Sequence, residues 1–133
     1  MRATMAGHKP AKGPLDAKLA RGGLVDLEFL VHYLQLRGGK ALHPHLGEAV
    51  RALVGAGLLP EPLIDAHDMM TRLLVAARMM APDAQVPLPA ACDVLAKACG
   101  FGDWEEVLPN LAHARSAVAD AWAQAFGEVL EVT

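Results

Sequence analysis

The chain has 133 residues and a formal net charge of −3, and 53% of its residues are hydrophobic. This composition supports one packed domain of ordinary size and argues against a disordered chain. Because acidic residues outnumber basic ones and no stretch is densely basic, the sequence offers little for phosphate-driven binding of nucleic acid.

The N-terminal residues 1–21 are predicted to form a connector arriving from an upstream domain. Two prolines and a glycine within residues 8–14 favour an extended or turning segment. No apolar run approaches the ~20 residues of a membrane span, and residues 1–12 lack the apolar stretch of a signal peptide. We therefore expect a soluble, cytoplasmic protein whose compact domain spans residues 22–133.

Five helical segments are predicted in chain order, because apolar residues recur at helical spacing and glycines or prolines mark the ends. The first segment begins after Gly22-Gly23 and stops at Gly38-Gly39. The others run from Pro44 to Ala56, from near Pro60–Pro62 to Met80, from Pro89 to Cys99 and from Asp103 towards Leu130. Asp103 and Glu106 have capping-box spacing, and Pro109 is expected to kink or divide the last helix. Since no segment shows the alternation of a strand, the expected fold class is all-α, a single bundle of about five helices.

The predicted core follows from the apolar stripes of these segments. In the first segment Glu28, His32 and Gln35 fall on a different face from Leu27, Leu30, Val31 and Leu34. The stripes of the later segments are Leu46, Val50, Leu53 and Val54; Leu63, Met70, Leu73, Leu74 and Ala77; and Leu111, Val118, Trp122, Phe126 and Val129. The only cysteines, Cys92 and Cys99, are roughly 10 Å apart along one helix, too far for a disulfide, so buried free thiols and a reducing compartment are expected.

Most catalytic arrangements are absent from the sequence. The only serine, Ser116, lies in a helical stretch, and there is neither a Walker loop nor a dinucleotide fingerprint. A metal site built from His43, His45 and the pair His67-Asp68 is disfavoured, because the spacing fits no established zinc pattern. These histidines are better interpreted as solvated or helix-capping residues.

One stretch, residues 15–29, carries a pattern of chemical interest. Basic residues, paired glycines and the acids of a helix start follow one another there: Lys18, Arg21, Gly22, Gly23, Asp26 and Glu28. Free N–H groups at the helix start can face a phosphate beside the cations. In the alternative interpretation, which the residues alone favour, the glycines form a turn and the acids stabilise the positive helix end. The two carboxylates lie two residues apart on a helix and can hardly chelate one ion together.

This stretch resembles the glutamine synthetase adenylyltransferases. Their pattern is Asp-x-Lys, a few residues, then Gly-Gly-(Leu/Ile)-x-Asp-(Ile/Leu)-Glu-Phe, matched here by Asp16, Lys18, Gly22, Gly23, Leu24, Asp26, Leu27, Glu28 and Phe29. The order of His43-Pro44, Gly57-Leu58-Leu59 and Gly100-Phe101-Gly102-Asp103 extends the resemblance over nearly the whole chain. Asp26 suits the adenylylating, C-terminal half of such enzymes, so the resemblance implies the helical domain after the adenylylating nucleotidyltransferase domain.

The resemblance also implies a division of labour. Family catalytic domains carry Gly-Ser and Asp-x-Asp motifs, whose carboxylates hold magnesium, and neither motif occurs in this sequence. The complete enzyme is expected to use ATP and magnesium to transfer AMP to a tyrosine of glutamine synthetase in nitrogen regulation. Its implied partners are the upstream nucleotidyltransferase domain, glutamine synthetase and, through the complete enzyme, a nitrogen signal protein. The chain alone is expected to be inactive, to hold no cofactor or metal, and to act in cleft closure, substrate positioning or regulation.

Within that resemblance, we hypothesise roles for the residues of the motif. Lys18, Arg21 and the paired glycines 22–23 would border the nucleotide cleft. Asp26 and Glu28 would hold the loop against basic groups of the catalytic domain. Two departures from the family bear on the polar faces, since His32 stands where the family often has Gln and Leu74 lies near an expected acid.

Two alternatives stay open from the sequence. One is a stand-alone helical protein-interaction domain, in which the motif only packs. The other is the related helical domain of a uridylyltransferase that modifies the nitrogen signal protein. A companion domain separated from its partner is expected to expose an apolar or unpaired polar face around residues 22–29, and a stand-alone domain is not.

Overall fold

The computed structural model describes residues 13, 15–18, 22–38, 45–80, 83 and 85–127. These residues form five α-helices, one short 3-10 helix and no strand, which confirms the all-α prediction. The elements are α2 (Leu24–Gly38), α3 (Leu46–Gly55), α4 (Pro62–Met80), α5 (Pro89–Ala98), η1 (Trp104–Glu106) and α6 (Val107–Phe126). The first half of the predicted connector, the pair His43-Pro44 and Val129 lie outside the described residues.

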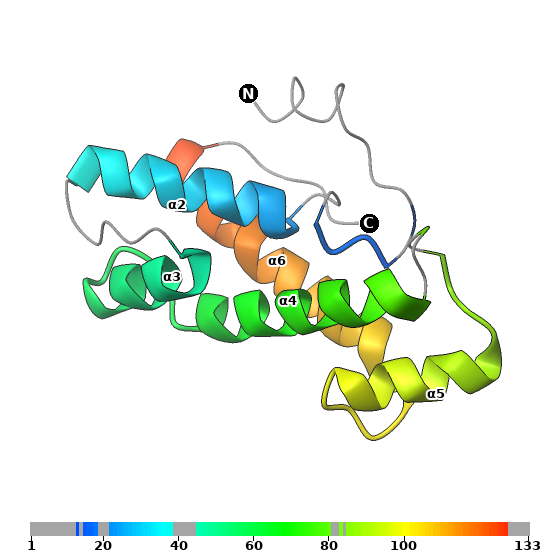
Figure 1. Ribbon diagram of the computed structural model, residues 1–133. Coiled ribbons are helices and arrows are strands. Elements are labelled where there is room, and N and C mark those ends of the chain that lie inside the picture. Colours follow the sequence, from blue (N-terminus) through cyan, green and yellow to red (C-terminus); the bar gives the residue numbers. More distant parts are fainter. Residues whose placement is uncertain are drawn as a thin grey trace.

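The two longest helices, α4 and α6, pack against each other at the centre of the bundle. Helix α2 lies against α3, α4 and α6, and α5 lies against α4. Figure 1 shows α6 passing behind α2 and α4, with α3 near the beginning of α4 and α5 beneath its second half. None of the helices in the described part of the chain combines the length and apolarity that a membrane crossing requires.

A single apolar core joins these helices. Its largest side chains with less than 2% exposure are Trp122, Leu15, Leu27, Leu30, Leu53, Leu63, Met70, Leu73, Leu95, Val31, Val50 and Val107. Burying each such side chain contributes about 1.5–3 kcal/mol, so the packed stripes, and not helix propensity, hold the bundle together. The predicted stripes are confirmed for the described residues. Five of their members lie at the edge of the core and are only partly buried: Leu34, Leu46, Val54, Leu74 and Phe126. Leu15 and Ala17, which were assigned to the connector, also belong to this core.

Two sequence predictions need correction. Gln35 was placed on the outer face of its helix, but it follows Val31 by one turn and is only 6% exposed. The segment predicted from Asp103 is divided in two, into η1 and α6, but the division does not fall at Pro109 itself. Pro109 lies in the first turn of α6, where a proline costs no intrahelical hydrogen bond, and the change from 3-10 to α-helix occurs two residues earlier, at Val107.

The start of η1 is capped by the two acids predicted for it. The Oδ1 of Asp103 accepts a hydrogen bond from the N–H of Glu105 at 2.8 Å. The Oε2 of Glu106 accepts one from the N–H of Gly102 at 2.9 Å. The pattern is therefore a capping box displaced by one residue at each bond.

Both cysteines are free and buried, as predicted. Burial raises the pKa of the Cys99 thiol, and the nearby positive charge of Arg72 opposes part of that increase. Since only the thiolate is a strong nucleophile, Cys99 has the environment of a packing residue.

Leu73→Ala is expected to lower the free energy of unfolding by about 2–5 kcal/mol, because its side chain is fully buried at the centre of α4. The matched control is Leu36→Ala, which makes the same change in a helix at a position that is 84% exposed, and is expected to cost within about 0.5 kcal/mol. Urea unfolding followed by circular dichroism measures both. Equal losses in the two variants would contradict the packing described above.

Candidate functional site

The paired glycines of the motif form a tight turn that packs directly onto α6. Gly22 has a φ of 76°, a left-handed backbone angle that residues other than glycine rarely adopt. A Cβ added at Gly22 would overlap the main-chain carbonyl oxygen of Arg115. Glycine is therefore required here both by the backbone angle and by the approach of a second helix.

Asp26 holds this turn from inside the protein. Its side chain is only 1% exposed, and its Oδ2 accepts a hydrogen bond from the N–H of Gly22 at 2.8 Å. Asp26 is the third residue of α2, the position from which an acid reaches back over a helix start in a capping box. The carboxylate also lies near the positive end of the helix dipole, which stabilises its charge.

The first N–H groups of α2 are bonded within the chain. The N–H of Leu24 donates to the carbonyl of Ala17 at 2.8 Å, and the N–H of Val25 donates to the carbonyl of Lys18 at 3.0 Å. Residues 15–18 thus lie across the start of α2 and cap it with their main chain. Because these donors are used, they do not form the phosphate site that the sequence left open, and the turn interpretation is favoured.

Arg115 is the residue of this site that the sequence did not reveal. Burial lowers the pKa of its guanidinium, and the negative charge of Asp26 opposes that decrease. The two residues come from α2 and α6, which are far apart in the sequence and meet only because the helices pack. No spacing rule connects them, so only the tertiary structure identifies the pair.

The phenylalanine of the motif is a packing residue. Its ring lies 5.5 Å from that of Trp122 and 5.9 Å from that of Phe126, measured between centroids. Tyr33, one turn further along α2, lies 4.6 Å from Phe126. Phe29 therefore joins α2 to the second half of α6 through tilted aromatic contacts.

The structure separates the predicted site residues into two groups. Gly22, Gly23 and Asp26 are brought together in the buried turn, whereas Lys18 and Glu28 are exposed. Arg21 lies outside the described residues. Glu28 continues into an outward side of α2 with His32 and Leu36, one turn apart each and all exposed. We call Lys18, Glu28, His32 and Leu36 the α2 surface.

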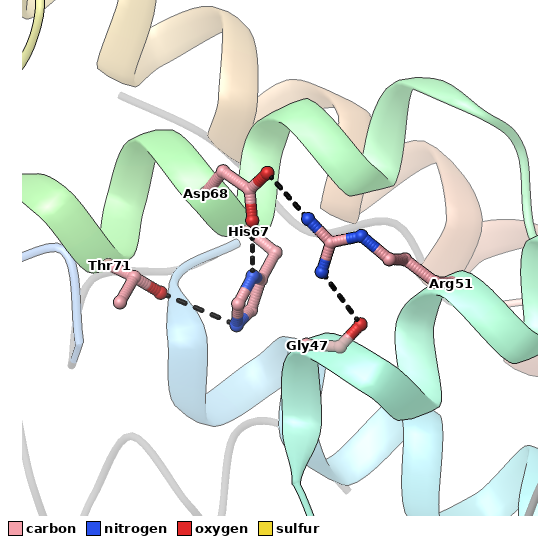
Figure 2. Close-up of polar contacts among 5 residues, drawn as sticks. All are labelled: Gly47, Arg51, His67, Asp68 and Thr71. Atoms are coloured by element: carbon pink, nitrogen blue, oxygen red, sulfur yellow. Dashed lines mark hydrogen bonds and ion pairs between the residues drawn. The ribbon is translucent and has the colours of Figure 1, made fainter.

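A second polar cluster joins α3 to α4 (Figure 2). The guanidinium of Arg51 forms an ion pair with Asp68, Nη2 to Oδ2 at 3.0 Å, and its Nη1 donates to the carbonyl of Gly47 at 3.3 Å. The other carboxylate oxygen of Asp68 lies 3.0 Å from Nδ1 of His67. The remaining ring nitrogen of His67 lies 3.4 Å from the hydroxyl of Thr71.

This cluster is structural in its geometry. Both ring nitrogens of His67 are directed at protein groups, and a Cβ added at Gly47 would lie 2.9 Å from Cε1 of His67. His45 is exposed just before α3, and His43 lies outside the described residues. In the part of the chain that the structure describes, no three histidine, cysteine or acidic side chains are grouped so as to hold a metal.

Comparison with known proteins finds one matching family model and several similar sequences. A family model described as GlnD PII-uridylyltransferase matches residues 1–126. The chain is also similar to proteins named bifunctional glutamine synthetase adenylyltransferase/adenylyl-removing enzyme: it is 33% identical to that of Caulobacter vibrioides over 92% of this chain, 31% to that of Brucella suis over 80% and 29% to that of Agrobacterium fabrum over 98%. It spans only 13%, 12% and 14% of these relatives, respectively. No solved structure matches the chain.

Gly22→Ala is expected to lower the free energy of unfolding by about 3 kcal/mol, because the methyl group adds an overlap with α6 to the strain of the left-handed angle. Gly57→Ala is a matched control, since Gly57 has a φ of 77° and nothing within 4 Å of an added Cβ. Its expected cost is about 1 kcal/mol, from the backbone strain alone. Chemical unfolding of both variants separates the cost of the backbone strain from the cost of the overlap with α6. Equal losses of stability in Gly22→Ala and Gly57→Ala would show that the contact with Arg115 is not tight.

Asp26→Ala is expected to cost about 1–3 kcal/mol of stability, because it leaves the N–H of Gly22 without its carboxylate acceptor. Asp26→Asn keeps an acceptor oxygen at the same place and removes only the charge, so a smaller loss is expected. The same unfolding measurement applies. If the asparagine variant lost as much as the alanine variant, then the charge, and not the hydrogen bond, would be the stabilising feature.

Proposed function

Since the chain belongs to the GlnD PII-uridylyltransferase family, we propose that it is the helical companion of a nucleotidyltransferase domain in a glutamine synthetase adenylyltransferase. In that enzyme AMP passes from ATP to a tyrosine of glutamine synthetase. The observation that carries the proposal is the similarity to adenylyltransferases along almost the whole of this chain. The uridylyltransferase name of the family model fits a helical architecture that both kinds of nucleotidyltransferase share.

In this proposal the chain positions the catalytic domain and does not itself contribute the residues that catalyse AMP transfer. Its sequence contains neither the Gly-Ser pair nor the Asp-x-Asp motif of the family's catalytic domains. Asp26 is committed to the Gly22 turn, and Glu28 points to the opposite side of the helix. These donors do not fit a magnesium site, so ATP and magnesium are assigned to the neighbouring domain.

The α2 surface is the proposed contact with that domain. Lys18 and Glu28 flank the buried turn and offer charges of both signs, and the exposed side chain of Leu36 extends the surface with apolar area. Arg21 belongs to the proposed contact by its position in the motif. The buried residues Gly22, Gly23 and Asp26 affect this contact indirectly, because they fix the start of α2.

The test is a chimera in which this chain replaces the matching segment of the Caulobacter vibrioides relative. We expect it to adenylylate glutamine synthetase. Lys18→Ala or Glu28→Gln in the chimera is expected to lower the transfer rate by roughly tenfold, the effect of losing about 1.4 kcal/mol of charged contact at a domain boundary.

Lys97→Ala and Glu105→Gln remove exposed charges elsewhere in the domain and serve as controls, with no change expected. A correctly folded chimera without transfer would contradict the proposed function. Transfer that is equally insensitive to all four substitutions would contradict the role of the α2 surface while leaving the family function intact.

A further inference from the structure

A groove of about 460 Å³ lies between the first half of α4 and the first half of α6. This volume is within the usual range of ligand-binding clefts, about 300–1,000 Å³. Its apolar floor includes Ala66, Met69 and Ala114. The small alanine side chains leave room between two helices that otherwise pack closely.

The wall of the groove on α4 is acidic. Glu61, the residue before α4, and Asp65, in the first turn of α4, both line it, and both are exposed. Within the described part of the chain, no ion pair or side-chain hydrogen bond joins either carboxylate to another residue. Their charges favour the start of α4, but no cation of the described residues neutralises them.

We propose that this groove binds a basic segment of a partner protein, with an arginine side chain lying in it. The aliphatic part of the arginine would rest on the apolar floor, and its guanidinium would reach Glu61 and Asp65. Long cationic side chains bind in this divided manner, with the stem on apolar surface and the charge at a polar edge. Arginine fits best, because its planar fork pairs with carboxylates through two parallel hydrogen bonds. The net charge of −3 also favours the approach of a cationic partner.

The groove is separate from the α2 surface. His113 lines the groove, whereas the guanidinium of Arg115 is close enough to Asp26 of the Gly22 turn for the two charges to interact. Two residues along an α-helix are rotated by about 200°, so these side chains point to nearly opposite sides of α6. The groove therefore stays open when the α2 surface meets a neighbouring domain, and its occupant is an additional partner.

The test is a titration of the isotopically labelled chain with a 14-residue peptide of alanine and leucine carrying arginines four residues apart, followed by nuclear magnetic resonance. We expect saturable shifts confined to residues 61–69 and 110–117. The double variant Glu61→Gln with Asp65→Asn is expected to weaken binding by roughly tenfold, from two exposed charge pairs. Asp93→Asn with Asp120→Asn removes the same charge from other exposed positions and is expected to change affinity less than twofold. A peptide with citrulline in place of arginine keeps the shape without the charge and should not bind.

Several results would overturn the proposal. One is the absence of saturable shifts in the groove, and another is equal weakening in the two double variants, which would indicate unspecific attraction by the net charge. Equal binding of the citrulline peptide would show that the floor alone is recognised. Shifts of the groove residues on concentrating the chain without peptide would identify a second copy as the occupant. All of these measurements use the chain alone, so their failure is distinguishable from failure of the adenylyltransferase chimera.

Discussion

The hydrogen bond from the N–H of Gly22 to the carboxylate of Asp26 is the contact on which the geometry of the motif and the start of α2 depend. It closes a left-handed turn that sets the start of α2 and lets residues 15–18 cap the helix with their carbonyls. The same turn brings the chain against the main chain of α6 at Arg115. Because the bond is buried, its loss would expose neither partner to water, and the stability it contributes is correspondingly large for a single hydrogen bond.

This arrangement changes how the Gly-Gly-x-x-Asp-x-Glu-Phe motif is understood. Its glycines, its aspartate and its phenylalanine are required by folding, since they make the turn and the aromatic contact with α6. Only Lys18 and Glu28 among the described residues of the motif face outward. The motif is thus mostly a structural requirement, and the residues of the proposed contact surface are the smaller part of it.

The sequence predicted the helices well because their ends are marked by glycine and proline and their apolar residues follow the helical period. It misplaced Gln35, since a polar residue on a buried face does not follow the apolar pattern. It expected Pro109 to kink or divide the last helix, and the division lies two residues before the proline, between η1 and α6. Arg115 and the groove between α4 and α6 could not be predicted, because both arise where helices distant in the sequence cross. For the site, residue types and spacing identified the turn but not which of its acids is buried.

The contact between Gly22 and Arg115 is made by backbone on backbone, and that has a mechanical consequence. A side chain between two helices can change rotamer and absorb a displacement, but two touching main chains have no such freedom. A displacement of the Gly22 turn is therefore expected to move α6 with it and not to be absorbed by a local rearrangement. Helix α6 in turn packs against α4 at the centre of the bundle. The close approach at Gly22 thus couples the positions of α2 and α6.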